Sequence, residues 1–188
     1  FIGMFAIAIY DEHADELFLC RDRTGVKPLF VYQHEDLLLF ASELKAFHKH
    51  PLFKKNLNID AVHAFFNFGY VPSPHCIFEN CYKIDAGEYI SYDLKNLKSK
   101  KKKYWSIETF YNQDKLDISY QEAKEKVKDL LKSSYAYRMV SDVPVGVFLS
   151  GGYDSTSVAT ILQSQSNIPV KTFTIGFKEG NNEAPYAK

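Results

Sequence analysis

The sequence contains only three cysteines and no apolar run of membrane-spanning length. Cys76 and Cys81 form a Cys-x4-Cys pair without a second pair, which is poor support for a zinc site. An odd count also argues against a disulfide framework, so we expect Cys20, Cys76 and Cys81 to be buried or loop thiols. The first residues lack the basic start and small-residue cleavage site of a signal peptide. These absences favour a cytoplasmic protein.

An excess of charge of either sign is missing as well, since 23 Lys and Arg balance 23 Asp and Glu. No long-range field therefore favours nucleic acid or an anionic membrane, and we expect neither as a partner. A basic run at residues 98–103 stands beside Tyr104 and Trp105, and a solvated turn explains it better than nucleic-acid contact. The apolar fraction of 46% is enough for a substantial core in one large or two small domains.

Short apolar segments separated by polar turns predict a β-meander in the first fifty residues. A helix should begin at a cap formed by Asn58 or Asp60 and continue to Phe68. A second strand-rich section runs from Ile77 to about Tyr92. The strands expected in the meander cover residues 3–10, 16–21, 28–33 and 37–41.

The last seventy residues have a helical and then a β-α-β pattern. Residues 119–122, Ser-Tyr-Gln-Glu, match a capping box at the start of a helix that should end before Pro144. Apolar segments at 145–149 and 170–175 flank a helical stretch over 155–165. This order predicts two parallel strands, both buried, joined by a right-handed crossover. A ligand should then lie beyond the carboxyl ends of the strands.

The strongest chemical signal is Ser150-Gly151-Gly152-Tyr153-Asp154-Ser155, which joins an apolar strand to a helix. Adjacent glycines allow several backbone N–H groups to point at one phosphate, and the helix N-terminus adds its positive dipole. Asp154 stands where a phosphate would lie, which makes chemical sense only with a metal ion between the two. Gly-Gly-x-Asp alone is equally compatible with a tight turn in which Asp154 or Ser155 caps the helix.

The complete loop is different from a Walker loop, because no lysine follows the glycines. It resembles the pyrophosphate-binding loop of the ATP pyrophosphatase superfamily. That resemblance implies cleavage of ATP between its α and β phosphates, with adenylation of an acceptor.

Motifs along nearly the whole chain resemble those of glutamine-hydrolysing asparagine synthetases. The resemblance implies an α/β (α+β) protein. Residues 1–112 would be the end of an N-terminal-nucleophile glutaminase β-sandwich domain, and residues 113–188 the start of a parallel-sheet ATP pyrophosphatase domain of the adenine nucleotide α-hydrolase type. The motifs lie at residues 3–6, 10–11, 21–30, 41–46, 68–72, 86–87, 104–105 and 139–147, ahead of the loop.

The family's N-terminal cysteine nucleophile and its glutamine-binding residues have no counterpart in this sequence. We therefore assign no glutaminase catalytic residue, and we expect a fragment that has neither activity by itself. For the parent protein the resemblance implies ATP-dependent amidation of aspartate through β-aspartyl-AMP, with ammonia from glutamine, and with ATP and Mg²⁺ as cofactors. A homodimer is compatible with this expectation. The alternatives are an enzyme that amidates another carboxylate and a non-catalytic homologue.

The resemblance also assigns binding residues. Asp154 would hold the magnesium ion, and Leu149 and Ile175 would contact the adenosine part of ATP. Met4 and Leu149 are candidates for the wall of an ammonia tunnel, although core packing explains Met4 equally well. The residues expected to bind ATP and its pyrophosphate are Leu149, Ser150, Gly151, Gly152, Asp154, Ser155 and Ile175.

Overall fold

The computed structural model describes residues 1–180 and 182–187. The chain divides into two compact units between Asp114 and Lys115, and each unit is described by itself. Over the described residues, no helix has both the length and the apolar character needed to cross a membrane.

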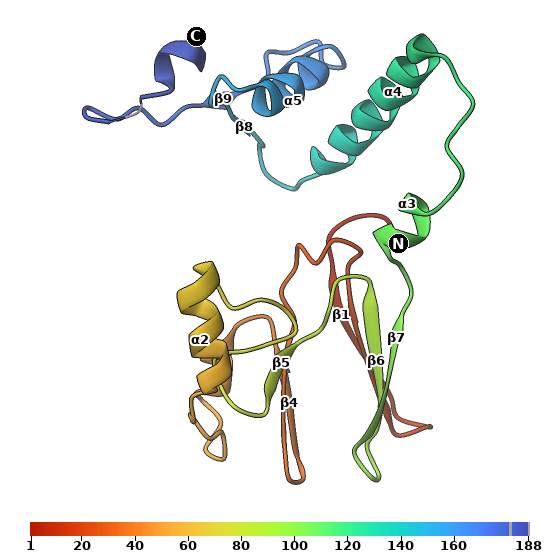
Figure 1. The fold of residues 1–188 in the computed structure, drawn as a ribbon, viewed down its shortest axis with the longest axis vertical. Helices are drawn as coiled ribbons and strands as arrows, with labels where there is room; N and C mark the ends of the chain where they lie inside the picture. Colours follow the sequence, from red (N-terminus) through yellow and green to blue (C-terminus); the bar gives the residue numbers. More distant parts are fainter. Residues whose placement is uncertain (181, 188) are drawn as a thin grey trace. The chain divides into compact units, whose positions relative to one another are not determined.

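Unit 1 contains two antiparallel sheets that lie side by side (Figure 1). The four-stranded sheet has the order β1-β2-β6-β7, and the three-stranded sheet has the order β4-β3-β5. Every neighbouring pair in both sheets is antiparallel. The strands are β1 (Ala6–Asp11), β2 (Glu16–Arg21), β3 (Phe30–His34), β4 (Leu37–Ala41), β5 (Cys81–Lys83), β6 (Glu88–Asp93) and β7 (Lys98–Lys103).

The four expected N-terminal strands are present, but the expected β-meander is wrong. The first two strands form one hairpin and the next two another, and the hairpins belong to different sheets. Strand β2 pairs with β6, from Glu16 opposite Asp93 to Cys20 opposite Tyr89. Apolar alternation predicts that a strand exists and which face it buries, whereas the choice of partner depends on how the connecting loop redirects the chain.

The core of unit 1 has two parts, separated by β3. Successive strand residues point to opposite faces of a sheet. Accordingly, the fully buried Val31 joins a cluster with residues of β2 and β6, and its fully buried neighbour Tyr32 joins a second cluster. Helix α1 (Leu44–Phe47) contributes to the second cluster through Phe47. Both faces of β3 are therefore buried, which makes it the central strand of this unit.

Helix α2 (Ile59–Phe68) begins and ends as its sequence indicates. The Asn58 side chain accepts a hydrogen bond from the Ala61 backbone N–H, so Asn58 is the cap and the alternative, Asp60, is not. Gly69 ends the helix in the left-handed conformation, with φ of 75°. The helix flanks the three-stranded sheet, on the side away from the four-stranded one (Figure 1).

The basic run is a strand, and the expectation of a solvated turn is wrong. Lys98–Lys103 form β7, which pairs with β6 at the edge of the four-stranded sheet. All six residues are exposed. Charged side chains are tolerated on an edge strand because only one side of it pairs, and lysines there discourage pairing with another chain.

The turn after β2 is organised by the fully buried carboxylate of Asp22. It accepts backbone N–H groups at 2.9 Å from Lys27, 3.0 Å from Val26, 3.2 Å from Thr24 and 3.3 Å from Phe5. Burial raises the pKa of this carboxyl group, but the backbone hydrogen bonds outweigh burial and lower the pKa below its ordinary value. Asp22 therefore fixes the loop that carries the chain from the first hairpin to the second.

Arg21 holds the other side of the same loop. Its guanidinium donates to the backbone carbonyl groups of Gly25 at 2.6 Å, Ile84 at 2.7 Å and Lys27 at 2.9 Å. Ile84 follows β5 directly, so this side chain ties the turn after β2 to the distant strand that completes the second sheet. Arg21 and Asp22, which are adjacent in the sequence, thus connect the two sheets through side-chain hydrogen bonds to backbone groups.

Unit 1 ends with helix α3 (Ile107–Tyr111), and unit 2 begins with helix α4 (Tyr120–Arg138). The capping box at the start of α4 is confirmed. The Ser119 side chain accepts the Glu122 backbone N–H, and the Glu122 carboxylate accepts the Ser119 N–H at 2.8 Å.

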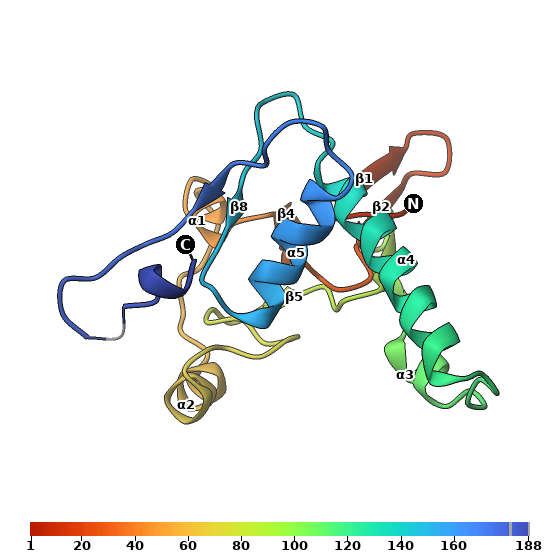
Figure 2. The ribbon, with the colours of Figure 1, turned by 90° about the horizontal axis from the view of Figure 1, so that it is seen from above.

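The β-α-β pattern of unit 2 is present in shorter form. It consists of β8 (Val147–Phe148), α5 (Tyr153–Gln163) and β9 (Thr172–Phe173), and the two strands are parallel. Helix α4 packs against α5, and α5 packs against β8 (Figure 2). The larger parallel sheet implied by the resemblance stays a prediction.

The expectation that both strands are buried is wrong for the described residues. Phe148 is 76% exposed and Phe173 is 56% exposed. These two aromatic rings lie beside each other, with centroids 6.4 Å apart. The reason is that, among the described residues of unit 2, α5 is the helix that packs closely against β8. Most of this small two-stranded sheet therefore stays exposed despite its apolar sequence.

Candidate functional site

The loop from Ser150 to Ser155 connects the end of β8 to the start of α5. Gly152 is the N-cap residue, and no side chain makes a capping hydrogen bond. The alternative in which Asp154 or Ser155 serves as the helix cap is therefore wrong. The first N–H groups of a helix have no partner within the helix, so this N-terminus presents donors and a positive dipole end.

Ser150 and Ser155 are brought into contact by the turn. Their hydroxyl groups lie 3.0 Å apart, and the Ser150 backbone N–H donates to Ser155 Oγ over 3.2 Å. Ser155 Oγ in turn donates to the Gly152 carbonyl at 3.3 Å. The two serines thus close the loop around its glycines.

Only one of the two glycines has a backbone conformation that favours glycine. Gly151 has φ of +83°, whereas Gly152 has φ of −77°. A Cβ atom at Gly151 would lie 2.6 Å from backbone atoms of Tyr186, in the 3₁₀ helix η1 (Ala184–Ala187). The Tyr186 contact was not predicted, because a sequence gives no sign of which distant backbone a glycine will meet.

Leu149 directly follows β8, and Ile175 lies two residues after β9. A cavity of about 280 Å³ lies beside Leu149, between α5 and β9. The Leu149 carbonyl accepts a hydrogen bond from Thr174 Oγ1 at 2.7 Å, which joins the two strand ends. Ile175 is 64% exposed and lies outside the lining of this cavity. The other lining residues are Thr156, Ala159, Thr160, Gln163, Val170, Thr172, Tyr186 and Ala187.

Asp154 is exposed in the first turn of α5. Within the described ranges, no three His, Cys, Asp or Glu side chains gather closely enough to hold a metal ion by themselves. Magnesium is usually held by one or two carboxylates together with substrate phosphates and water. The exposed carboxylate of Asp154, in the first turn of the same helix, is therefore a donor that fits magnesium bound together with a phosphate.

Met4, a candidate for the tunnel wall, lies in unit 1 and is 46% exposed. It is therefore not a core residue of this unit, and the core-packing alternative does not describe it. Its place in a tunnel stays a prediction.

Comparison with protein families gives two matches. Residues 1–105 match the glutamine amidotransferase domain family, and residues 126–188 match the asparagine synthase family. The first match covers the two antiparallel sheets of unit 1. The second covers most of α4 and the strand-loop-helix site.

Individual relatives cover almost the whole chain. A Methanocaldococcus jannaschii protein named "Putative asparagine synthetase (glutamine-hydrolyzing) 2" is 38% identical over 100% of this chain. Asparagine synthetase (glutamine-hydrolyzing) 2 of Bacillus subtilis is 34% identical over 99%, and Amidase chry2 of Gibberella zeae is 31% identical over 95%. The chain spans 36%, 26% and 28% of the lengths of these relatives, respectively.

The antiparallel unit and the strand-loop-helix unit together define a glutamine amidotransferase domain followed by part of a synthetase domain. More narrowly, the chain belongs to the family of glutamine-hydrolysing asparagine synthetases. It spans part of the length of the family members that it matches.

The close approach at Gly151 gives a testable prediction. In a full-length protein that releases pyrophosphate from ATP, Gly151→Ala should lower this release at least about tenfold, because a new methyl group would push η1 away from the loop. Left-handed strain should add a stability loss of about 1–2 kcal/mol. The assay is pyrophosphate release at saturating ATP, with thermal unfolding measured on the same samples.

Gly180→Ala is the matched control. Gly180 has φ of +86°, but among the described residues no atom lies within 4 Å of the point that a new methyl group would occupy. The variant should show the same strain and keep pyrophosphate release near the wild-type rate. Equal activity losses in both variants would show that strain, rather than contact with Tyr186, causes the defect.

Proposed function

We propose that the full-length protein makes asparagine from aspartate, using ATP and ammonia derived from glutamine. The supporting observation is that named glutamine-hydrolysing asparagine synthetases match this chain through both of its units. In this proposal residues 1–112 form the end of the glutaminase domain, and residues 113–188 the start of the synthetase domain. ATP would form β-aspartyl-AMP, and ammonia would displace AMP.

The loop would bind the part of ATP that leaves as pyrophosphate. The uncapped N-terminus of α5 offers backbone donors, and Gly151 allows the backbone to bend tightly around a phosphate group. Donors that are already in place when charge develops on the leaving group lower the barrier without reorganisation. The hydroxyl groups of Ser150 and Ser155, which lie 3.0 Å apart, would donate to phosphate in place of their present hydrogen bonds within the loop.

Asp154 would hold Mg²⁺, which when bound neutralises phosphate charge. Leu149 and Ile175 would contact the adenosine part of ATP, with Leu149 beside the cavity of about 280 Å³. The proposal places the protein in the cytoplasm, a compartment in which cysteines such as these three are ordinarily free thiols. A homodimer is compatible with this proposal.

The test is pyrophosphate release by the purified full-length protein with ATP, Mg²⁺ and single candidate acceptors. Aspartate should stimulate release well above glutamate or succinate, and asparagine should appear in equal amount when glutamine is present. Stimulation by a different carboxylate would replace aspartate as the acceptor. No stimulation by any acceptor, with intact nucleotide binding, would favour a non-catalytic homologue.

A further inference from the structure

Cys76 and Cys81 face each other across a short antiparallel turn in unit 1. An isolated antiparallel bridge pairs His75 with Tyr82, and the Lys83 N–H donates to the Pro74 carbonyl at 2.8 Å. This register places Cys76 opposite Cys81. Opposite residues of an antiparallel pair have Cα atoms roughly 4.5–5.5 Å apart, and disulfides span Cα separations of about 4.4–6.8 Å. The register is therefore compatible with a disulfide between the two cysteines.

Both thiols lie in the same apolar cluster, away from solvent. Cys76 is 1% exposed and Cys81 is 7% exposed. Their neighbours in the cluster are the aromatic side chains of Tyr32, Phe47 and Phe53. Such surroundings exclude large reagents and admit small neutral ones. Only small neutral oxidants should therefore react with this pair in the folded chain.

The pKa values of the two thiols are shifted in opposite directions. The hydrogen bond from the Cys81 thiol lowers the pKa of Cys76 to about 7, because it outweighs the effect of burial, and the backbone N–H groups of Phe78 and Ile77 add to it. The same hydrogen bond, together with burial, raises the pKa of Cys81. Cys76 is thus the sulfur that ionises more readily, and Cys81 is the one that keeps its proton.

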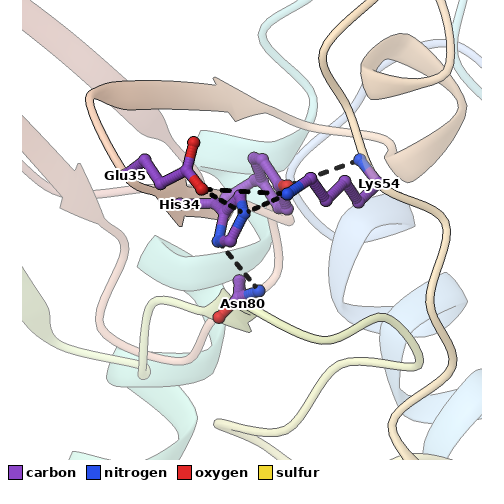
Figure 3. A network of polar contacts seen from close by, with 5 residues as sticks. His34, Glu35, Lys54 and Asn80 are labelled. Atoms are coloured by element: carbon purple, nitrogen blue, oxygen red, sulfur yellow. Dashed lines mark hydrogen bonds and ion pairs between the residues drawn. The ribbon is translucent and has the colours of Figure 1, made fainter.

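Hydrogen bonds between Asn80 and β3 hold the turn between the two cysteines. Asn80 has φ of 58°, and its carbonyl accepts the Gln33 backbone N–H at 3.0 Å. Its side chain contacts His34 Nδ1 at 3.4 Å, and His34 Nε2 lies 2.7 Å from Lys54 Nζ (Figure 3). These contacts connect the turn to β3 and to the segment after α1, so the facing arrangement of the thiols is fixed in advance.

The other side of the turn leads to α2. The Ile77 carbonyl accepts the N–H of Asn58, and the Glu79 N–H donates to the Asn56 carbonyl, both at 2.9 Å. Asn58 is the cap of α2. A covalent bond across the turn would therefore stiffen the segment from which this helix begins.

We propose that Cys76 and Cys81 form a peroxide-sensitive pair that oxidises to an intramolecular disulfide. The Cys76 thiolate attacks one oxygen of hydrogen peroxide, the O–O bond breaks, and hydroxide leaves. Hydroxide takes up a proton to become water, and Cys76 is now a sulfenic acid. The sulfur of Cys81 then attacks the sulfur of Cys76, the S–O bond breaks, and the thiol proton leaves with the oxygen as a second water. In sum, the two thiols lose two electrons and two protons, and one peroxide is reduced to two waters.

The digestion pattern of the chain makes the test specific. Trypsin cuts after Lys and Arg, so both cysteines fall in the single peptide 56–83, whereas Cys20 falls in the peptide that ends at Arg21. The whole chain is treated with a few equivalents of hydrogen peroxide, and it is then unfolded, alkylated and digested. The masses of the peptides are measured by mass spectrometry. Peptide 56–83 should lose two hydrogens and take up no alkyl group, and reductant should restore two alkylation sites. In the peptide that ends at Arg21, Cys20 should be alkylated throughout, because this buried cysteine has no facing thiol among the described residues.

Two variants separate the pair from general oxidation. Cys81→Ser should leave Cys76 as a sulfenic acid, with no loss of two hydrogens. Dimedone added during unfolding should trap this sulfenic acid once the apolar cluster opens. Cys20→Ser should oxidise as the wild type does. Full alkylation of peptide 56–83 after peroxide treatment, or oxidation of Cys20 at the same rate, would overturn the proposal. So would a disulfide found only between separate molecules. Because the wild-type experiment needs no variant, a folding defect in either substitution leaves the test intact.

Discussion

In the full-length protein, Asp154→Ala should lower amide formation at least about a hundredfold and leave glutamine hydrolysis within about twofold of wild type. Asp154 is the only carboxylate in the loop from Ser150 to Ser155. Without it, the negative charge of the departing pyrophosphate would lose the ion that neutralises it. Because Asp154 is exposed and does not cap α5, the substitution should barely change folding stability. The measurement is asparagine formation and glutamate release in parallel assays.

Two further variants make this result specific. Asp154→Asn keeps the shape of the side chain and removes its charge, so it should be nearly as inactive as Asp154→Ala. Asp129→Ala removes an exposed carboxylate from α4, whose ion pair with Lys132 spans 3.9 Å, and should retain activity. Unchanged amide formation in Asp154→Ala would remove this residue from the mechanism, and loss of both activities would indicate a structural role.

Asp22→Ala should lower the free energy of unfolding of unit 1 by about 3–5 kcal/mol. The substitution deprives backbone N–H groups of a buried acceptor, including those of Lys27 at 2.9 Å and Val26 at 3.0 Å. Trp105, the only tryptophan of the chain, lies in unit 1. Its fluorescence during urea unfolding therefore reports this unit.

Asp11→Ala is the matched control. Asp11 also accepts two backbone N–H groups, from His13 at 2.9 Å and Ala14 at 3.0 Å, but it is exposed. Water can replace it, so its loss should cost less than about 1 kcal/mol. Equal costs at Asp22 and Asp11 would contradict the role assigned to burial.

The stabilisation by Asp22 should also depend on pH. Its pKa is lower in the folded chain than its ordinary value of 3.8, which the unfolded chain retains. Stabilisation is therefore fully present above pH 3.8 and is lost as the pH falls through the lowered folded value. The difference between wild type and Asp22→Ala should shrink over that acidic range, and a constant difference would contradict the prediction.

Local signals in the sequence were sufficient for several elements of this fold. The strands Glu16–Arg21 and Leu37–Ala41 match the expected ranges, and both predicted helix caps, Asn58 and Ser119, are confirmed. These features depend on a few neighbouring residues. An alternating apolar pattern or a capping side chain needs no information from elsewhere in the chain.

Pairing and burial could not be predicted in the same way. Strand β2 pairs with β6, which lies about seventy residues later in the sequence. The lysine-rich segment Lys98–Lys103 forms a strand because its backbone pairs with the free edge of β6. Both apolar strands of unit 2 have an exposed aromatic ring. Each outcome depends on which elements meet in space, and a residue type does not carry that information.

For the candidate site, the sequence by itself determined that a glycine-rich loop with one carboxylate joins a strand to a helix. Only the tertiary structure decided that Gly151, rather than Gly152, has the left-handed backbone next to Tyr186, and that Ser150 contacts Ser155. It also placed Cys76 opposite Cys81, which the spacing alone did not indicate. The physical reason is the same in each case. Residue types fix local conformation and chemistry, whereas contacts between distant segments arise only when the folded chain closes its loops.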